Sequence, residues 1–283
     1  MEEEYIIETN RLDPQIMETE LKRCFPESER LLMEQDELYY YTDINAFVNG
    51  ILRNREDICL WASRWSHLND PEELNTGINE LKSIFPKELN WMIDGIKERM
   101  KKNHSISFSV YRDYLPMWKM YGDNGRGLML TFDTKELVKL WGGLLQPCLY
   151  KGSKEHIVSK ESILNTKVYP YLSGLTTQQQ YAMIWLLQIF VSITKNQEYD
   201  YEKEVRLIGV GNNYLGNNEM QRFRVSNNQI IPYVEVFIPN VALKNVCLGP
   251  LVKSELNEET LKEFLRFKGY DTVEVSTSNI HYR

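Results

Sequence analysis

Hydrophobic and polar positions follow two different periods along this chain. Short apolar runs rich in β-branched and aromatic residues have the length of strands, whereas longer segments repeat apolar residues at helical spacing. The sequence predicts nine strands, at residues 38–42, 58–62, 105–110, 128–132, 147–150, 205–210, 233–238, 245–248 and 272–276. It predicts helices at residues 43–52, 86–102, 114–121 and 153–195, after the Asp70-Pro71 pair, and before Gly269. Because strands and helices do not alternate regularly, we expect an α+β fold with a single mixed or antiparallel sheet and peripheral helices.

An acidic segment precedes the first predicted strand. Up to Leu38 the chain carries 12 acidic and 4 basic residues, a balance of −8, and the remainder is close to neutral at +1. Four apolar residues recur here at helical spacing and are expected to pack on the rest of the chain or on a partner: Ile16, Met17, Leu21 and Phe25. We therefore expect an acidic helical cap at residues 1–37, either solvated or docking a basic partner, and a second domain at residues 38–283.

Composition narrows the class of protein. The chain has 283 residues, of which 42% are hydrophobic and 26% charged, as in ordinary globular proteins. Its four cysteines are scattered without a Cys-x-x-Cys pair, which favours a reducing cytoplasm over a disulfide framework. The Met-Glu-Glu-Glu start is unlike a signal peptide, and the apolar run at 181–193 is too short to span a bilayer. We therefore expect no membrane association. The sequence shows no basic surface of the kind that generic nucleic-acid binders have.

Several common catalytic motifs are missing from the sequence. Glycines 122, 125 and 127 lead into a strand instead of a helix, so they match neither a dinucleotide fingerprint nor a Walker motif. The four histidines, His67, His104, His156 and His281, are isolated and lack metal-ligand spacing. No Gly-x-Ser-x-Gly elbow occurs. The sequence therefore predicts chemistry that uses no metal.

The most informative stretch runs from Tyr199 to Gly211. It opens acidic and aromatic and then becomes a β-branched apolar strand. Glu202 and Glu204 lie where a loop enters this strand, with Arg206 next, and residues two apart on an extended chain face the same side. Buried charges are costly unless they are paired. Two interpretations remain open, an ion-pair ladder at the rim of the sheet and a catalytic glutamate with a helper aimed into a cleft.

Polar and aromatic residues elsewhere add to this pattern. They fall in three groups, which are Tyr39 to Thr42; Ser63 to Ser66 with Asn69 and Asp70; and Ser107 to Ser109 with Trp118 and Tyr121. Each group alone has a plain explanation in core packing or helix capping. Together with one glutamate they suit cleavage of the glycosidic bond of NAD. A carboxylate stabilises the oxocarbenium-like ribose, and aromatic faces hold the cationic nicotinamide.

Six segments carry a resemblance to a known family. They are Leu38-Tyr-Tyr-Tyr-Thr42, Leu60-Trp-Ala-Ser63, Leu68-Asn-Asp-Pro-Glu72, Met117-Trp-Lys-Met-Tyr-Gly-Asp123, Gly127-Leu-Met-Leu-Thr-Phe-Asp133 and Tyr201-Glu-Lys-Glu-Val-Arg206. Their order resembles an uncharacterised bacterial domain family that in turn is similar to ADP-ribosyltransferases. The resemblance implies the ADP-ribosyltransferase fold for residues 38–283. It also implies Glu204 as catalytic residue with Glu202 as helper. The residues that it expects to bind NAD, as substrate, are Tyr40, Thr42, Ser63, Ser107, Ser109, Trp118 and Tyr121.

The same resemblance implies a role. Small bacterial relatives of this superfamily are often toxins or antiviral-defence effectors, so a mono-ADP-ribosyltransferase acting on a nucleic acid or protein is expected, along with an inhibitory or antitoxin protein partner. A local basic rim for nucleic acid would come from Lys101, Lys102, Arg112, Lys119 and Arg126. Two alternatives stay open. One is an NAD glycohydrolase with water as acceptor. The other is a non-catalytic binding module. It is favoured by Tyr40, which by the resemblance stands where ADP-ribosyltransferases have His or Arg.

Overall fold

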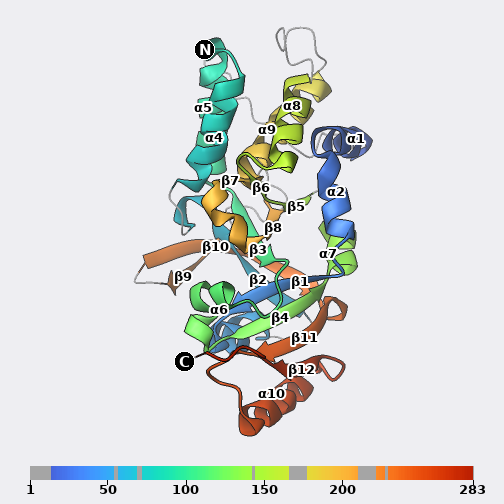
Figure 1. The fold of residues 1–283 in the computed structure, drawn as a ribbon, viewed down its shortest axis with the longest axis vertical. Coiled ribbons are helices and arrows are strands. Elements are labelled where there is room, and N and C mark those ends of the chain that lie inside the picture. Colours follow the sequence, from blue (N-terminus) through green and yellow to red (C-terminus); the bar gives the residue numbers. More distant parts are fainter. Residues whose placement is uncertain are drawn as a thin grey trace.

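A computed structural model describes residues 14–53, 57–68, 72–141, 144–165, 177–209, 221–226 and 229–282. Its centre is a ten-stranded sheet (Figure 1). The strands are β1 (Glu37–Thr42), β2 (Asp57–Arg64), β3 (His104–Ser109), β4 (Leu128–Asp133), β5 (Leu145–Pro147), β8 (Glu204–Ile208), β9 (Arg222–Ser226), β10 (Gln229–Pro239), β11 (Leu243–Leu248) and β12 (Glu274–Thr277). Two short strands, β6 (Leu149–Tyr150) and β7 (Thr194–Lys195), pair separately and in parallel. Eight of the nine predicted strands are present near their expected bounds, and the predicted strand at 147–150 is divided between β5 and β6.

The order and direction of the strands define a mixed sheet. The main path runs β12-β11-β4-β1-β3-β2-β10-β9, and β8 lies against β3 and β5. All pairs in this sheet are antiparallel except β11 with β12, so the predicted α+β fold with a mixed sheet is confirmed. A mixed sheet of this kind follows from connections of unequal length, because only long crossovers join parallel neighbours.

Strand β3 is the branch point of the sheet. One of its edges pairs with β8 from Ser105 to Ser109. On the other edge, Ser109 pairs with Tyr39 of β1, whereas Ser105 pairs with Ser63 of β2. Between these two pairings β1 and β2 diverge, and no described strand takes the edge of β3. The divergence leaves room for a pocket over the middle of β3.

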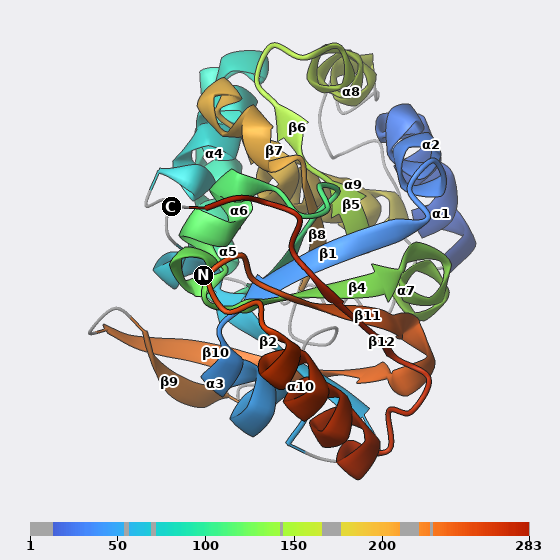
Figure 2. The ribbon, with the colours of Figure 1, turned by 60° about the horizontal axis from the view of Figure 1, so that its bottom comes forward.

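Helices cover the sheet at two ends (Figure 1). The upper group consists of α1 (Pro14–Cys24), α2 (Pro26–Met33), α4 (Glu73–Ile84), α5 (Asn90–Met100), α8 (Lys154–Asn165) and α9 (Thr177–Ile193). At the other end, α10 (Glu255–Lys268) lies beside β12 (Figure 2). The remaining helices are α3 (Ile44–Ala46), which continues as a π-helix over Phe47–Ile51, α6 (Leu115–Met120) and α7 (Thr134–Trp141).

Helix α9 accounts for the longest apolar run. Its side chains from Leu186 to Ile193 are buried, and it packs against α1, α4, α5 and β8. A helix that is apolar on all sides is stable in water only when it is enclosed in this way. None of the helices described here combines the length and the apolar character that a bilayer crossing requires.

From residue 14 on, where the structure describes it, the acidic segment contains two helices, α1 and α2. Phe25 and Leu32 are buried in the same apolar cluster as the sheet, and Leu21 packs against that cluster. This agrees with the prediction for Leu21 and Phe25. The side chains of Ile16 and Met17 lie outside the described residues, as do residues 1–13.

Helix boundaries follow local chemistry where the structure describes them. Asp43 is the N-cap of α3 and accepts a hydrogen bond from the Ala46 amide at 2.7 Å. Gly269 ends α10 with a φ of +85°, a backbone conformation that favours glycine. The predicted start at Asp70-Pro71 falls outside the described residues, and α4 is described from Glu73.

Candidate active site

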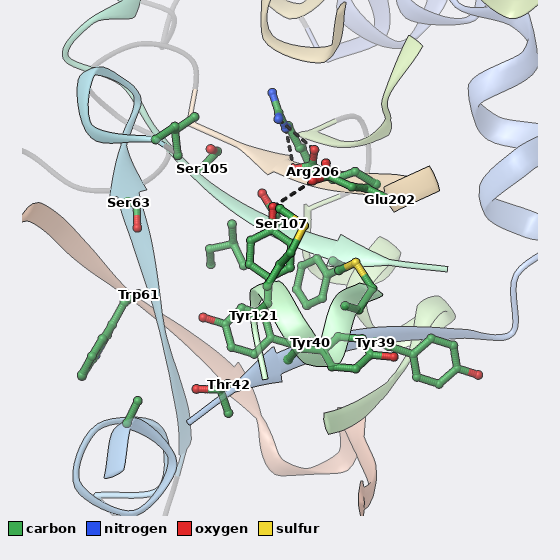
Figure 3. Close-up of a pocket in the computed structure, with 18 of the residues that line it drawn as sticks. Tyr39, Tyr40, Thr42, Trp61, Ser63, Ser105, Ser107, Tyr121, Glu202 and Arg206 are labelled. Atoms are coloured by element: carbon green, nitrogen blue, oxygen red, sulfur yellow. Dashed lines mark hydrogen bonds and ion pairs between the residues drawn. The ribbon is translucent and has the colours of Figure 1, made fainter. Parts of the chain in front are cut away.

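A pocket of about 500 Å³ occupies the space where β1 and β2 diverge. Its size is typical of small-molecule sites. The lining includes Tyr39 to Thr42 from β1, Trp61 and Ser63 from β2, Ser105 to Phe108 from β3, Tyr121, Lys195, Glu202, Glu204, Arg206 and Arg224. Figure 3 shows the aromatic rings of Tyr40, Tyr121 and Trp61 on one side of Ser107, with Glu202 and Arg206 on the other. The pocket therefore combines aromatic faces, hydroxyls and charged groups.

Four charged side chains form a buried ion quartet in one wall of this pocket. Glu204 accepts two hydrogen bonds from Arg206, at 2.7 Å to Oε1 and 2.8 Å to Oε2. Lys195 Nζ lies 2.7 Å from Glu204 Oε2 and also binds Glu202 Oε2. The two carboxylates and two cations cancel in charge, which makes their burial tolerable. The charged residues of the Glu-x-Glu-x-Arg stretch thus form ion pairs, as one of the two interpretations expected. The same residues also line a pocket.

The backbone reaches this arrangement by a route that the sequence pattern does not predict. Glu202 is the last residue of a 3-10 helix (Gln197–Glu202) instead of a strand residue, so the expectation of one extended face holding both glutamates is wrong. Lys203 follows in the left-handed region, with φ 40° and ψ 57°, and ends the 3-10 helix before β8 begins at Glu204. Both carboxylates nevertheless converge, because Lys195 binds them together.

Neighbouring side chains fix the backbone on both sides of Lys203. Ser109 donates its hydroxyl to the Glu202 carbonyl at 2.8 Å. The Glu204 amide donates to the Tyr150 hydroxyl at 2.8 Å. Arg206 also donates to the Ser192 carbonyl at 2.7 Å and stacks over the Trp65 ring at 5.1 Å. These contacts limit the motion of both carboxylates, as a preorganised site requires.

The protonation states follow from these contacts. Burial alone would raise the pKa of Glu204, but the charges and hydrogen bonds of Arg206 and Lys195 outweigh it and hold that pKa well below its ordinary value. Burial and the charges of Glu202 and Glu204 raise the pKa of Tyr121. Glu204 is therefore ionised at neutral pH, and Tyr121 keeps its proton and donates it to Glu202 Oε1 at 2.9 Å.

Most residues expected to bind NAD do line the pocket. Tyr40, Thr42, Ser63, Ser107 and Tyr121 are all in its wall, and Ser107 is exposed in it. Tyr40 packs edge-on against Phe108, with ring centroids 6.0 Å apart.

Ser109 and Trp118 lie outside the pocket lining. Ser109 is buried and acts on the Glu202 backbone, as described above. Trp118 is fully buried in a separate cluster with Tyr39, Tyr41 and Met129, where its indole donates to Asp113 at 2.8 Å. Helical spacing with Tyr121 was therefore a misleading guide for Trp118, since its ring lies on the core side of α6. Asn69 and Asp70 lie outside the described residues.

Two cations of the pocket were not predicted. Lys195 lies two residues after the end of the apolar helix α9, and a lysine so close to such a helix would have been a usable signal for a buried ion pair. Arg224 lies on β9, donates to the Ser63 hydroxyl at 2.9 Å, and has its guanidinium 5.6 Å from the Trp61 ring centre. Strand β9 lacks a continuous apolar run, which is why the sequence pattern missed it.

Other chemistries find little support in the part of the chain that the structure covers. No group of three or more potential metal ligands occurs among the described residues. All four cysteines are buried, and burial raises the pKa of the Cys59 and Cys247 thiols to about 11 in each case. Such thiols are poor nucleophiles at neutral pH.

Comparison with known proteins gives one partial match. The model of a protein family of unknown function (DUF2971) matches residues 117–207. This range contains Tyr121, Lys195, Glu202 and Arg206, but not β1, β2 or β9. No curated protein and no solved structure matches the chain. These comparisons link the chain to a family of unknown function in that range, and nothing in them links it to ADP-ribosyltransferases.

Proposed function

We propose that the protein consumes NAD and transfers its ADP-ribose to an acceptor. The observation that carries this proposal is the position of Glu202. It is a carboxylate held on two sides, by Tyr121 and Lys195, in the wall of a pocket that also presents aromatic rings and hydroxyls. Cleavage of a nicotinamide–ribose bond needs such a carboxylate beside the ribose and an aromatic surface beside the leaving group.

The chemistry balances without a further reagent. The bond between nicotinamide nitrogen and ribose breaks, and its electron pair leaves with nicotinamide, which becomes neutral. The ribose carbon gains oxocarbenium character, and a nearby carboxylate stabilises that positive charge. A nucleophile on the acceptor then forms the new bond and releases its proton. Water as acceptor gives hydrolysis, and a macromolecule gives transfer.

Glu202 is better suited than Glu204 to meet the ribose, which reverses the roles expected from the sequence. An ionised carboxylate has about four acceptor positions. Glu204 uses three of them for charge-assisted bonds to Arg206 and Lys195. Glu202 uses two in the described structure, for the bonds from Tyr121 and Lys195. We therefore assign contact with the ribose hydroxyl to Glu202 and a positioning role, through Lys195, to Glu204.

Aromatic residues of the pocket supply the second requirement. Tyr121 binds Glu202 through its hydroxyl and presents its ring to the same space, as Figure 3 shows. Tyr40 faces the pocket from β1. A stacked aromatic contributes about 0.5–1.5 kcal/mol beyond burial, so these rings suffice to orient a nicotinamide but not to bind NAD alone.

The test is nicotinamide release from NAD by the purified protein. We expect release in the wild type and a loss of about a hundredfold or more in Glu202→Gln, which keeps shape but removes charge. Glu80→Gln is the matched control. Glu80 is also a buried carboxylate paired with two lysines, Lys151 at 3.0 Å and Lys160 at 2.9 Å, but it lies outside the pocket. Equal rates in Glu202→Gln and wild type would contradict the assignment.

The acceptor is found by a second assay. Labelled NAD is incubated with the protein and a cell lysate, which is then treated with nuclease or protease. Label lost on nuclease treatment identifies a nucleic acid, and label lost on protease treatment identifies a protein. Free ADP-ribose without labelled macromolecule identifies water, and the protein is then an NAD glycohydrolase.

One observation favours a second candidate, a non-catalytic binding module. The ion quartet is neutral and well bonded, so it could serve the fold alone. This candidate predicts NAD binding by calorimetry with no nicotinamide release, and detectable release by the wild type contradicts it.

A further inference from the structure

We propose that the part of the pocket formed by Arg224, Ser63 and Ser105 is a binding subsite for a phosphate group. The three residues come from three strands, β9, β2 and β3, and all line the pocket. The inference deepens the proposed function, and it rests on that function only for the identity of the ligand as a nucleotide.

Two hydrogen-bond donors in this part of the pocket lack partners. The Oγ of Ser105 and the Nε of Arg224 are both buried atoms without a hydrogen bond in the described structure. Ser105 as a whole is 3% exposed. Buried donors are nearly always satisfied, because an unmade hydrogen bond leaves the cost of desolvation uncompensated. Two such donors on one pocket wall indicate that a ligand with acceptor oxygens completes them.

Arg224 has no carboxylate partner among the described residues. It contacts the Ser63 hydroxyl and the Trp61 ring. Arg222, two residues earlier on the same strand, is instead paired with Glu235 at 3.1 Å. A planar guanidinium matches the oxygens of phosphate in a bidentate manner. The Nε atom of Arg224, which has no hydrogen-bond partner in the described structure, suits this geometry.

The surrounding strands hold the three groups in register. Ser63 and Ser105 are direct cross-strand partners of β2 and β3. The Nη2 of Arg224 donates to Ser63, and the Trp61 ring lies beside the guanidinium at 5.6 Å from its centre. Stacking on an indole restricts the guanidinium without consuming its donors. The arginine is therefore oriented before any ligand enters.

The distance to the ion quartet sets the size of the ligand. Ser105 and Ser107 share one face of β3, and Ser107 is the cross-strand partner of Arg206. Two strand residues span ~7 Å, so the Ser105 and Arg206 ends of the pocket are separated by roughly that distance or more. A single phosphate ion cannot touch both ends. A nucleotide can, with its ribose at Glu202 and a phosphate at Arg224.

The experiment measures binding without turnover. Calorimetry compares adenosine, AMP, ADP and inorganic pyrophosphate on wild type, Arg224→Gln and Arg222→Gln. We expect ADP to bind wild type at least ~10-fold more tightly than adenosine, and Arg224→Gln to remove that difference. Arg222→Gln is the matched control, from the same strand, and should behave as wild type. Ser105→Ala, a small change on a different strand, should weaken ADP binding without affecting adenosine.

Several outcomes would overturn the subsite. They are equal affinities for adenosine and ADP in wild type, an equal loss in Arg222→Gln and Arg224→Gln, or no binding of ADP or pyrophosphate. Thermal unfolding checks that each variant is folded, and Arg224→Lys replaces Arg224→Gln if the latter is not. Because no step needs nicotinamide release, ADP binding in a protein inactive on NAD would sustain the subsite while rejecting the proposed reaction.

Discussion

The hydroxyl of Tyr121 donates to Glu202 Oε1 at 2.9 Å and thereby ties the end of α6 to the turn before β8. These two residues are 81 positions apart in sequence. Burial and the nearby carboxylates raise the pKa of Tyr121, so this donor keeps its proton at neutral pH. The contact gives Glu202 a fixed orientation toward the pocket.

Replacing Tyr121 with Phe removes that hydroxyl and keeps the ring. A hydrogen bond to a charged group contributes about 1.5–3 kcal/mol, so we expect a lower free energy of unfolding by about that amount, measured by urea denaturation. The rate of nicotinamide release should also fall, with little change in KM. Tyr270→Phe is the control, since the buried Tyr270 hydroxyl has no hydrogen-bond partner in the described structure. A stability loss in both variants would contradict the prediction.

Replacing Lys195 with Met should break the quartet. Glu202 then loses the cation beside it, and Glu204 keeps Arg206 alone, which costs about 3–5 kcal/mol of unfolding free energy. The Lys195 charge helps to hold the pKa of Glu204 low, so its removal raises that pKa in the folded state, and the loss should be smaller at pH 5 than at pH 8. The control is Lys151→Met, which removes an exposed lysine from Glu80 and keeps Lys160 as its partner. The loss of unfolding free energy should stay below about 1 kcal/mol. Similar costs for the two variants would rule out a buried quartet.

Histidine 104 should make stability depend on pH. Burial, with a smaller effect from the Arg64 charge, lowers the pKa of His104 from 6.5 to about 4. The unfolded chain therefore binds this proton before the folded chain does. The contribution of His104 to stability is complete above pH 6.5 and is lost as the pH falls toward 4. Urea denaturation between pH 7 and pH 4 measures it, and His104→Gln should flatten the curve. An unchanged slope would show that His104 is solvated.

A methyl group at Gly127 should disturb the pocket through the backbone. A Cβ there would lie 2.1 Å from the Thr42 carbonyl at the end of β1, and a backbone atom has little room to move. We expect Gly127→Ala to destabilise the fold by about 1–3 kcal/mol or more. Gly95→Ala, within α5, meets no atom within 4 Å and should stabilise the protein by about 0.5–1 kcal/mol. Chemical denaturation measures the free energy of unfolding of both variants. Equal changes in the two would contradict the close contact predicted at Gly127.

Local sequence patterns determined the secondary structure and part of the site. Eight of the nine strands predicted from apolar runs are present near their expected bounds, because residues such as Val205 to Ile208 favour an extended, buried chain. The polar, aromatic character of Tyr40, Thr42, Ser63, Ser107 and Tyr121 also identified pocket residues correctly. These predictions needed only the preference of each residue and its immediate neighbours.

Tertiary structure alone decided which distant residues meet. Lys195 joins the two glutamates because α9 ends beside β8, and Arg224 reaches Ser63 because β9 adds to β10 at the sheet edge. Trp118 faces the core instead of the pocket for the same reason, since the packing of α6 fixes which side it turns inward. Strand register and helix docking depend on how residues distant in sequence pack together in the core. A local sequence pattern carries no information on that packing.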